Sequence, residues 1–214
     1  MLNILIDYHQ DILSGLKVTL LASLTVLVGS MIIGTLMALL QGAKRHWIRR
    51  IGNTYVNFFR NVPLLIIVMF FFVVLPLYGL KMNGILSGTI GLTLYTSSFI
   101  ADTVRAGIEA VPKGQTEAGV SQGLTHFQIM FYIVLPQAFK LALPSLGNQF
   151  INLVKNSSIL AMVAGADLMY QGDIIASTTF NTIGTYTLIG LIYLAMTLPL
   201  SYVMRYVEKK LAVS

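Results

Sequence analysis

The sequence predicts an all-α integral membrane protein that crosses the bilayer five times and forms a single domain over residues 1–214. Of these 214 residues, 56% are hydrophobic and 10% are charged, which is far less charge than the surface of a soluble domain carries. The charges also stand at wide intervals: Lys17 and Lys44 bracket about 26 uncharged residues. A helix of about 20 apolar residues crosses the hydrocarbon layer, so such intervals are long enough to be spans.

The expected spans follow the uncharged runs in chain order. We place them at about residues 18–40, 62–77 and 85–104, then after Pro136, and finally at 183–204. The first span carries the small residues Gly29, Ser30 and Gly34, which allow close contact with another helix. Gly84 and Gly88 form a similar small-residue pair at the start of the third span.

The ends of the second and fourth spans are set by prolines and by charged residues. The second carries Pro63 and Pro76 near its two ends, where proline is tolerated in a helix. In the fourth, only about 14 uncharged residues separate Lys140 from Lys155, so this span has to extend past one or both lysines. Between the fourth and fifth spans, residues 167–179 mix polar and apolar side chains, and we expect a short helix on the outer surface there.

Lysine and arginine gather in three places that should lie on the cytoplasmic side: residues 44–50, 105–113 and 205–210. The other side then receives Asp7 and Asp11, which gives an N-out, C-in topology with an odd number of spans. The net charge of +6 is explained by this orientation, so we expect no nucleic acid partner. The N-terminal residues lack the basic start and cleavage site of a secretory signal peptide, and we expect them to be retained.

One polar segment cannot lie in lipid. Residues 107–123 include two carboxylates, a lysine, a proline and several glycines, so they lie in water or against another protein. A subunit driven by a separate engine needs a rigid element of this kind, such as a short helix along the membrane surface. We expect Gly119 and Gly123 to form its turn, because glycine adopts positive φ without steric cost. We expect Glu117 in the first turn of the following helix, where the helix dipole favours a carboxylate.

The run of residues 117–136, EAGVSQGLTHFQIMFYIVLP, resembles the EAA loop of ABC importer permeases, the cytoplasmic element that meets the ATPase. The matching positions are Glu117, Ala118, Gly119, Gly123, Ile133, Leu135 and Pro136. Gly119 departs from the usual second alanine, which is a mild change. Further segments resemble the polar amino acid branch of these importers: YVNFFRNVPLL at 55–65, RAGI through GQ at 105–115, LPQA at 135–138 and KNSSI at 155–159.

The resemblance covers nearly the whole chain and implies a type I importer permease: a five-helix core with a cytoplasmic coupling-helix loop, in a prokaryotic cell membrane. It implies pairing with a second copy or a close paralogue, two ATP-binding cassette subunits, an extracytoplasmic substrate-binding protein, and a polar amino acid as cargo. The chain itself would need no cofactor, because the partner ATPase binds ATP and Mg²⁺. The sequence agrees with that division, since it contains no P-loop motif.

The same resemblance implies two sets of site residues. Coupling to the ATPase falls to Gln115, Glu117, Ala118, Gly119 and Gly123, and the substrate pathway to Lys155, Asn156, Ser157 and Ser158. Lys155 lies roughly 22 Å along the fourth span from Lys140, where its ammonium could bias the pathway toward a carboxylate. The other interpretation is a lysine that reaches the outer interface while the serines bond backbone carbonyls. Asn156 stands where an acidic residue is frequent, which bears on the charge of the substrate. The absence of an intramembrane carboxylate favours neutral or acidic amino acids, such as glutamine or glutamate, over cationic ones.

Three charged residues on the other spans have plain expected roles. Asp102 and Arg105 are three residues apart on the third span and can pair along one helix face. Arg60 stands near the start of the second span, and we expect it to anchor that span in the headgroup region, with a contact to the loop or to the ATPase as the other option.

Two other functions have some support in the sequence. An ion-gradient-driven secondary transporter or channel subunit is the main alternative, but it would need intramembrane carboxylates or an internal repeat, and we find neither. Residues 119–123 fit the G-x-S-x-G pattern of a serine hydrolase at Ser121, yet they lie within the polar loop and not between a strand and a helix. The three histidines are isolated and cysteine is absent, so no metal site is expected.

Overall fold

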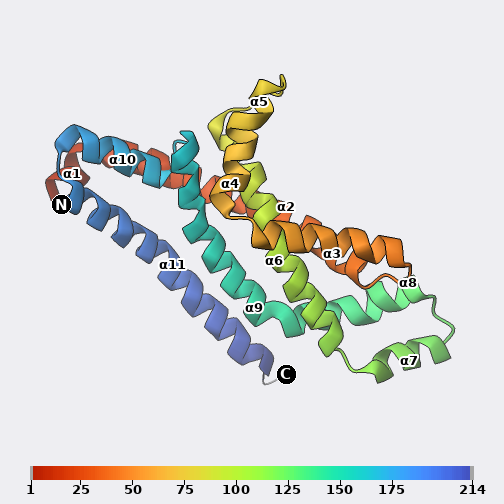
Figure 1. The fold of residues 1–214 in the computed structure, drawn as a ribbon. Coiled ribbons are helices and arrows are strands. Elements are labelled where there is room, and N and C mark those ends of the chain that lie inside the picture. The colour runs from red at the N-terminus through yellow and green to blue at the C-terminus, as the bar shows by residue number, and fades with distance from the viewer. Residues whose placement is uncertain (1, 213–214) are drawn as a thin grey trace.

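The computed structural model describes residues 2–212, and in this range every regular element is a helix (Figure 1). The long helices are α2 (His9–Gln41), α6 (Gly84–Ala110), α9 (Leu135–Asn156) and α11 (Thr182–Ala212), and the short α1 (Leu2–Asp7) precedes them. Within the described residues, four helical segments are long and apolar enough to cross a membrane, and a bent pair becomes the fifth if it counts as one span. The predicted all-α membrane architecture is therefore confirmed, with four or five spans.

The second expected span is a helical run with a π-helical stretch in its middle. Its residues form α4 (Leu64–Met69), η1 (Phe70–Val74) and α5 (Leu75–Leu77). A separate helix, α3 (His46–Asn61), meets this segment at an angle of 104°. Pro63 explains the bend, because the residue before a proline is held away from the α region, and Val62 is extended at φ −94° and ψ 131°. Residues 64–77 of the expected second span thus form one helical run that begins after Pro63, and the bend at its start joins it to a helix that the sequence did not predict.

Another proline explains where the fourth span begins. The helix expected after Pro136 starts earlier, because α8 (His126–Gln128) and η2 (Ile129–Val134) run without a break into α9. A proline ring clashes with the carbonyl four residues back in an α-helix, and the wider π turns of η2 precede this proline and relieve that clash. The same order recurs at Pro76, which follows the π turns of η1. The continuous segment is 38 residues long and contains both lysines, as predicted.

The core joins four helices. Its largest cluster takes residues from α2, α3, α6 and α9: Ala38, Val56, Ile100, Ala101, Val104, Ala142 and Leu146. Gly34 lets α2 approach α6, because a Cβ atom there would lie 2.8 Å from the Ser97 carbonyl oxygen. Gly88 lies equally close to the Leu160 side chain. The small residues of the first and third spans therefore serve close helix packing, as the sequence predicts.

Two short helices connect the long ones at opposite ends of the bundle (Figure 1). α7 (Lys113–Ser121) follows α6 at the end where α11 also terminates. At the other end, η3 (Ser157–Val163) and α10 (Leu168–Thr179) join α9 to α11. α10 fills most of the segment 167–179, so the short helix predicted there is confirmed.

Candidate functional site: an exposed helix and a polar cavity

Helix α7 presents nearly its whole surface to solvent. Of its nine residues, only Gly119 is buried. Gln115, Glu117 and Ala118 are all exposed. A helix of this length is marginal by itself in water, so neighbouring segments have to fix its position.

One face of α7 rests on the start of the fourth span. Gly119 lies so close to η2 that a Cβ atom would stand 2.8 Å from Cγ1 of Ile129 and 3.1 Å from Cδ1 of Ile133. Ile129 in turn belongs to a small buried cluster between α6 and the fourth span. Gln137 Nε2 donates to Gln115 Oε1 at 3.3 Å, which ties α7 to α9. α7 is therefore held at Gly119 and Gln115, and its other residues are exposed to solvent.

The turn after α7 has a defined geometry. Gly123 has φ +75°, so the turn expected at this glycine is confirmed. The N–H groups of Gly123 and Leu124 donate back to carbonyls in the last turn of α7, at 2.9 and 3.1 Å. These bonds form a Schellman motif, which satisfies carbonyls at a helix C-terminus. Thr125 and Gln128 then form a capping box that starts α8. The loop is therefore a firm connection.

Two expectations for this loop are wrong. Gly119 does not form the turn, because it lies inside α7, where the missing Cβ atom allows contact with η2. Glu117 does not lie in the first turn of a following helix, because α7 begins at Lys113 and places it in mid-helix. The carbonyl of Glu117 accepts a hydrogen bond from the Ser121 hydroxyl at 3.0 Å. That hydroxyl is engaged with its own helix, as helical serines commonly are, and is not presented as a nucleophile.

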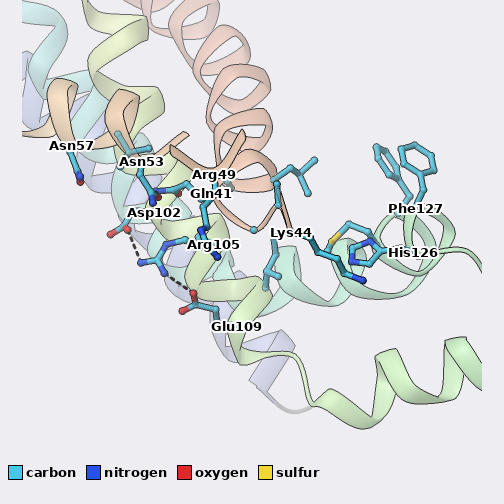
Figure 2. Close-up of a pocket in the computed structure, with 18 of the residues that line it drawn as sticks. Gln41, Lys44, Arg49, Asn53, Asn57, Asp102, Arg105, Glu109, His126 and Phe127 are labelled. Carbon is cyan, nitrogen blue, oxygen red and sulfur yellow. Dashed lines mark hydrogen bonds and ion pairs between the residues drawn. The ribbon is translucent and has the colours of Figure 1, made fainter. Parts of the chain in front are cut away.

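A cavity of about 1040 Å³, lined by both polar and apolar side chains, opens beside this loop (Figure 2). Its walls come from the end of α2, one face of α3, the C-terminal half of α6 and the start of the fourth span. Polar side chains recur along α3 at helical spacing: Arg49, Asn53, Asn57 and Arg60. Figure 2 shows Asn53 and Asn57 on the side of α3 that faces Asp102 of α6. The sequence interpretation omitted this stripe, although its spacing of three to four residues is a helical signal.

Four charges form a chain on the wall of this cavity. Arg60 Nη1 donates to Asp102 Oδ2 at 2.8 Å, and Arg105 Nη2 donates to Asp102 Oδ1 at 3.2 Å. Arg105 Nη1 continues the chain to Glu109 Oε1 at 2.6 Å. The predicted pair of Asp102 and Arg105 is confirmed. Arg60, expected to anchor the second span in the headgroup region, has a partner that the sequence did not predict, because α3 turns it toward Asp102 of α6, with its guanidinium 5.3 Å from the centre of the Phe99 ring.

The four residues expected to line the substrate pathway lie where α9 passes into η3. Lys155 and Ser158 line a second cavity of about 300 Å³, which they share with Tyr193 of α11. Ser157 is buried. The hydroxyls of the two serines donate to backbone carbonyls at 2.7 and 2.9 Å, as the other interpretation of these residues has it. Asn156 ends α9, half-buried and outside the lining of that cavity.

At the same end of the bundle, Asp167 fixes the start of α10. Its carboxylate is fully buried and accepts from the N–H groups of Met169 and Tyr170 at 3.1 and 3.3 Å. Burial raises the pKa of Asp167 to about 6, because desolvation disfavours the charged form more than these hydrogen bonds favour it. The neighbouring Leu168 N–H donates to Thr19 Oγ1 of α2 at 3.0 Å. α10 is therefore tied to the long helices through buried groups.

Comparison with known proteins decides the family. A family model described as the binding-protein-dependent transport system inner membrane component matches residues 10–213. The chain belongs to this family. The permease is 47% identical, over 98% of its length and 97% of the other protein, to the probable glutamine ABC transporter permease protein GlnM of Bacillus subtilis (strain 168). It is 34% identical, over the full length of both chains (100%), to the putative glutamine transport system permease protein GlnP of Rickettsia felis.

Solved structures agree with this assignment. The permease superposes with a TM-score of 0.88 on a chain from the crystal structure of an amino acid ABC transporter with histidines, at 33% identity and 96% coverage of both chains. A chain of the MetNI methionine ABC transporter in an inward-facing conformation gives a TM-score of 0.77 at 20% identity, covering 94% of the permease and 98% of that chain. The second likeness shows the fold alone.

Membership in the family confirms the predicted role and location. The permease is a multi-pass transport subunit of the inner membrane, and ATP hydrolysis belongs to a partner subunit. Such permeases work with an ATPase and a substrate-binding protein. The relatives support this function and not an ion-gradient-driven transporter. Among the described residues, no group of three or more His, Cys, Asp or Glu side chains could hold a metal ion.

Proposed function

We propose that this permease carries a polar amino acid into the cell as the membrane subunit of an ATP-driven importer. Relatives that align with almost the whole chain are named as glutamine or amino-acid permeases, and L-glutamine is the first cargo to test. In this proposal the passage lies in a pair of permeases, formed by two copies or by this chain and a close paralogue. Two ATP-binding cassette subunits, which bind ATP and Mg²⁺, sit on one side of the pair, and an extracytoplasmic binding protein delivers the cargo to the other.

The proposed orientation has five spans, with the N-terminus outside the cell and the C-terminus inside. Lys44, Arg49 and Arg105 surround the cavity beside α7. α11 ends on the same side of the bundle with Lys209 and Lys210 in its last turn. Lysine and arginine favour the cytoplasmic side of a membrane protein, so α7 is cytoplasmic. The bent pair of α3 and α4 then counts as one broken span.

We assign α7 as the EAA coupling helix, and its exposure is the observation that carries the proposal. A nine-residue helix with one buried position buries too little to serve the core of this chain. Its firm attachment by Gly119, Gly123 and Gln115 nevertheless fixes its direction. Glu117 and Ala118 then project toward a cleft in the ATPase. A push on α7 passes directly into α6 on one side and through η2 into α9 on the other.

The outer part of the passage is proposed at the junction of α9 and η3. Lys155 and Ser158 supply an ammonium and a hydroxyl to the small cavity there, while Asn156 and Ser157 add neutral polar groups next to it. In the Asn156→Asp variant, a new carboxylate should raise uptake of cationic amino acids relative to glutamate. Competition uptake assays with both classes of substrate check this. Identical uptake profiles for the two proteins would remove these residues from the passage.

Reconstitution tests the function as a whole. The permease and its ATPase are reconstituted into proteoliposomes with ATP on the side of the ATPase. The binding protein and radiolabelled L-glutamine are added on the other side, and transport of the label across the membrane is followed. Uptake should require ATP and all three components, and an uncoupler of ion gradients should leave it unchanged. Uptake that continued without the ATPase and stopped with the uncoupler would favour the ion-gradient alternative. A binding assay on the cognate binding protein identifies the cargo independently.

A further inference from the structure

The charge chain in the large cavity ends in the ion pair between Arg60 and Asp102. Arg60 and Asp102 belong to different helices, both line the cavity, and their side chains are 40% and 34% exposed. Each carboxylate oxygen of Asp102 accepts from a different arginine, and Arg60 uses one terminal nitrogen for this contact. The Phe99 ring supports the guanidinium from the other side. Arg60 therefore keeps its place with further N–H donors available.

The contact between Arg60 and Asp102 is inexpensive to exchange. Ion pairs with this degree of exposure contribute little to stability, so a molecule that offers both charges can replace the pair with little loss. A carboxylate alone would take Arg60 and leave Asp102 with Arg105 as its one partner, and an ammonium alone would leave Arg60 without its carboxylate. The geometry consequently favours a ligand that carries a positive and a negative group together.

The rest of the cavity supplies neutral hydrogen-bonding groups. Gln41 Nε2 donates to Asn53 Oδ1 at 3.1 Å, and Asn57 lies one turn further along α3. These carboxamides can exchange hydrogen bonds with an uncharged polar side chain. Two cationic groups also line this cavity: Lys44, from the loop after α2, and Arg49, from the first turn of α3.

We propose that a free zwitterionic amino acid binds at this pair on its way to the cytoplasm. Its α-carboxylate binds Arg60, its α-ammonium binds Asp102, and its side chain lies toward Asn53 and Asn57. The site rests on the proposed function, since it is the cytoplasmic part of the same passage. At this site, selection among ligands depends on the α-ammonium and the α-carboxylate of the amino acid and not on its side chain.

The two ends of the charge chain connect this site to moving parts. Arg60 lies three residues before Pro63, where α3 and α4 bend by 104°. Glu109 lies at the end of α6, with only Ala110 to Pro112 between it and α7. A ligand that separates Arg60 from Asp102 therefore loosens the bend, and a displacement of α7 pulls on the same chain from its other end.

Equilibrium binding to the purified permease and ATPase complex, without the binding protein, tests the site. The probes are L-glutamine, 4-carbamoylbutanoate, which lacks the ammonium, and L-glutamine amide, which lacks the carboxylate. The wild-type complex should bind L-glutamine at least about tenfold more tightly than either analogue, a difference of about 1.4 kcal/mol. In Asp102→Asn, the preference over 4-carbamoylbutanoate should vanish. In Arg60→Gln, the preference over the amide should vanish and the other should remain.

Two controls separate binding from folding. Asp102→Glu keeps the negative charge and should keep both binding preferences. Asp173→Asn removes a carboxylate from α10, at the end of the bundle opposite the cavity, and should also keep both preferences. Each variant is first shown to co-purify with the ATPase, and if one of the two test variants does not, the other still decides. Unchanged preferences in the test variants, or no binding of L-glutamine to the wild-type complex, would overturn this site while ATP-dependent uptake in proteoliposomes upheld the proposed function. Loss of that uptake in the wild type would overturn the function itself.

Discussion

The helices α7 and α10 are both short connections between long helices, but they are attached in opposite ways. α7 has nine residues, of which one is buried, and it is held by close contact at Gly119 and by the turn at Gly123. α10 has twelve residues, four of them buried, and its start is capped by the fully buried Asp167. The connecting helix α10 is therefore packed into the rest of the chain, whereas α7 leaves most of its surface exposed.

The difference separates structure from function in this permease. A connection that only closes the fold gains stability by burying apolar groups and satisfying its polar ones, as α10 does. α7 leaves its polar and apolar side chains exposed although its backbone is fixed, which is the expected state of a helix awaiting a partner. Substitutions in α10 should affect the stability of the permease, and substitutions in α7 should affect its coupling.

The largest expected effect comes from filling the contact beneath α7. Gly119→Leu places a side chain where a Cβ atom alone would stand 2.8 Å from Ile129, so α7 has to move away from η2. ATP-dependent uptake should fall by at least about tenfold, while the melting temperature changes little. The exposed Ser177 of α10 offers a matched control, since Ser177→Leu adds the same side chain at the other end and should keep the ATPase bound. Full uptake in Gly119→Leu would show that the close contact between α7 and η2 is not needed for transport.

The second effect concerns stability. Asp167→Ala removes the side chain that caps α10, and loss of an N-cap typically costs about 0.5 to 2 kcal/mol. Thermal unfolding of the purified permease at about pH 4, where the buried carboxyl is protonated and carries no charge, should shift to lower temperature. Co-purification with the ATPase at neutral pH should persist. An unchanged melting temperature would mean that α10 is held by its apolar contacts alone.

A smaller effect is a dependence of stability on pH. The pKa of Asp167 is about 6 in the folded protein, and its ordinary value, which applies to the unfolded chain, is 3.8. Between these two pH values the folded protein therefore holds a proton that the unfolded chain has released. Stability should therefore be highest below about pH 4, fall as the pH rises to about 6, and stay level above. Thermal unfolding at several pH values measures this. Asp167→Asn does not titrate and should lose the pH-dependent part, and an identical pH profile in that variant would assign the titration to another group.

Much of the fold and part of the site could be predicted from the sequence, because lipid imposes long apolar runs that are visible without a structure. The polar loop and its turn at Gly123 followed from the same physics. The role of Gly119 could not be predicted, since a glycine that allows packing and one that allows a turn look alike until the neighbouring helix is placed. The partnership of Arg60 and Asp102 was also hidden, because it depends on the bend at Pro63 that directs α3 toward α6.

The central claim is that α7, and not α10, receives the ATPase, and site-specific cross-linking tests it most directly. The chain contains no cysteine, so a single Glu117→Cys or Ser177→Cys substitution gives one reactive thiol on either helix. A short thiol-to-amine cross-linker is added to the assembled complex in membranes, and products are probed for the ATPase. Glu117→Cys should give a permease–ATPase product and Ser177→Cys should give none. A product from Ser177→Cys alone, or from neither variant, would contradict the assignment of α7.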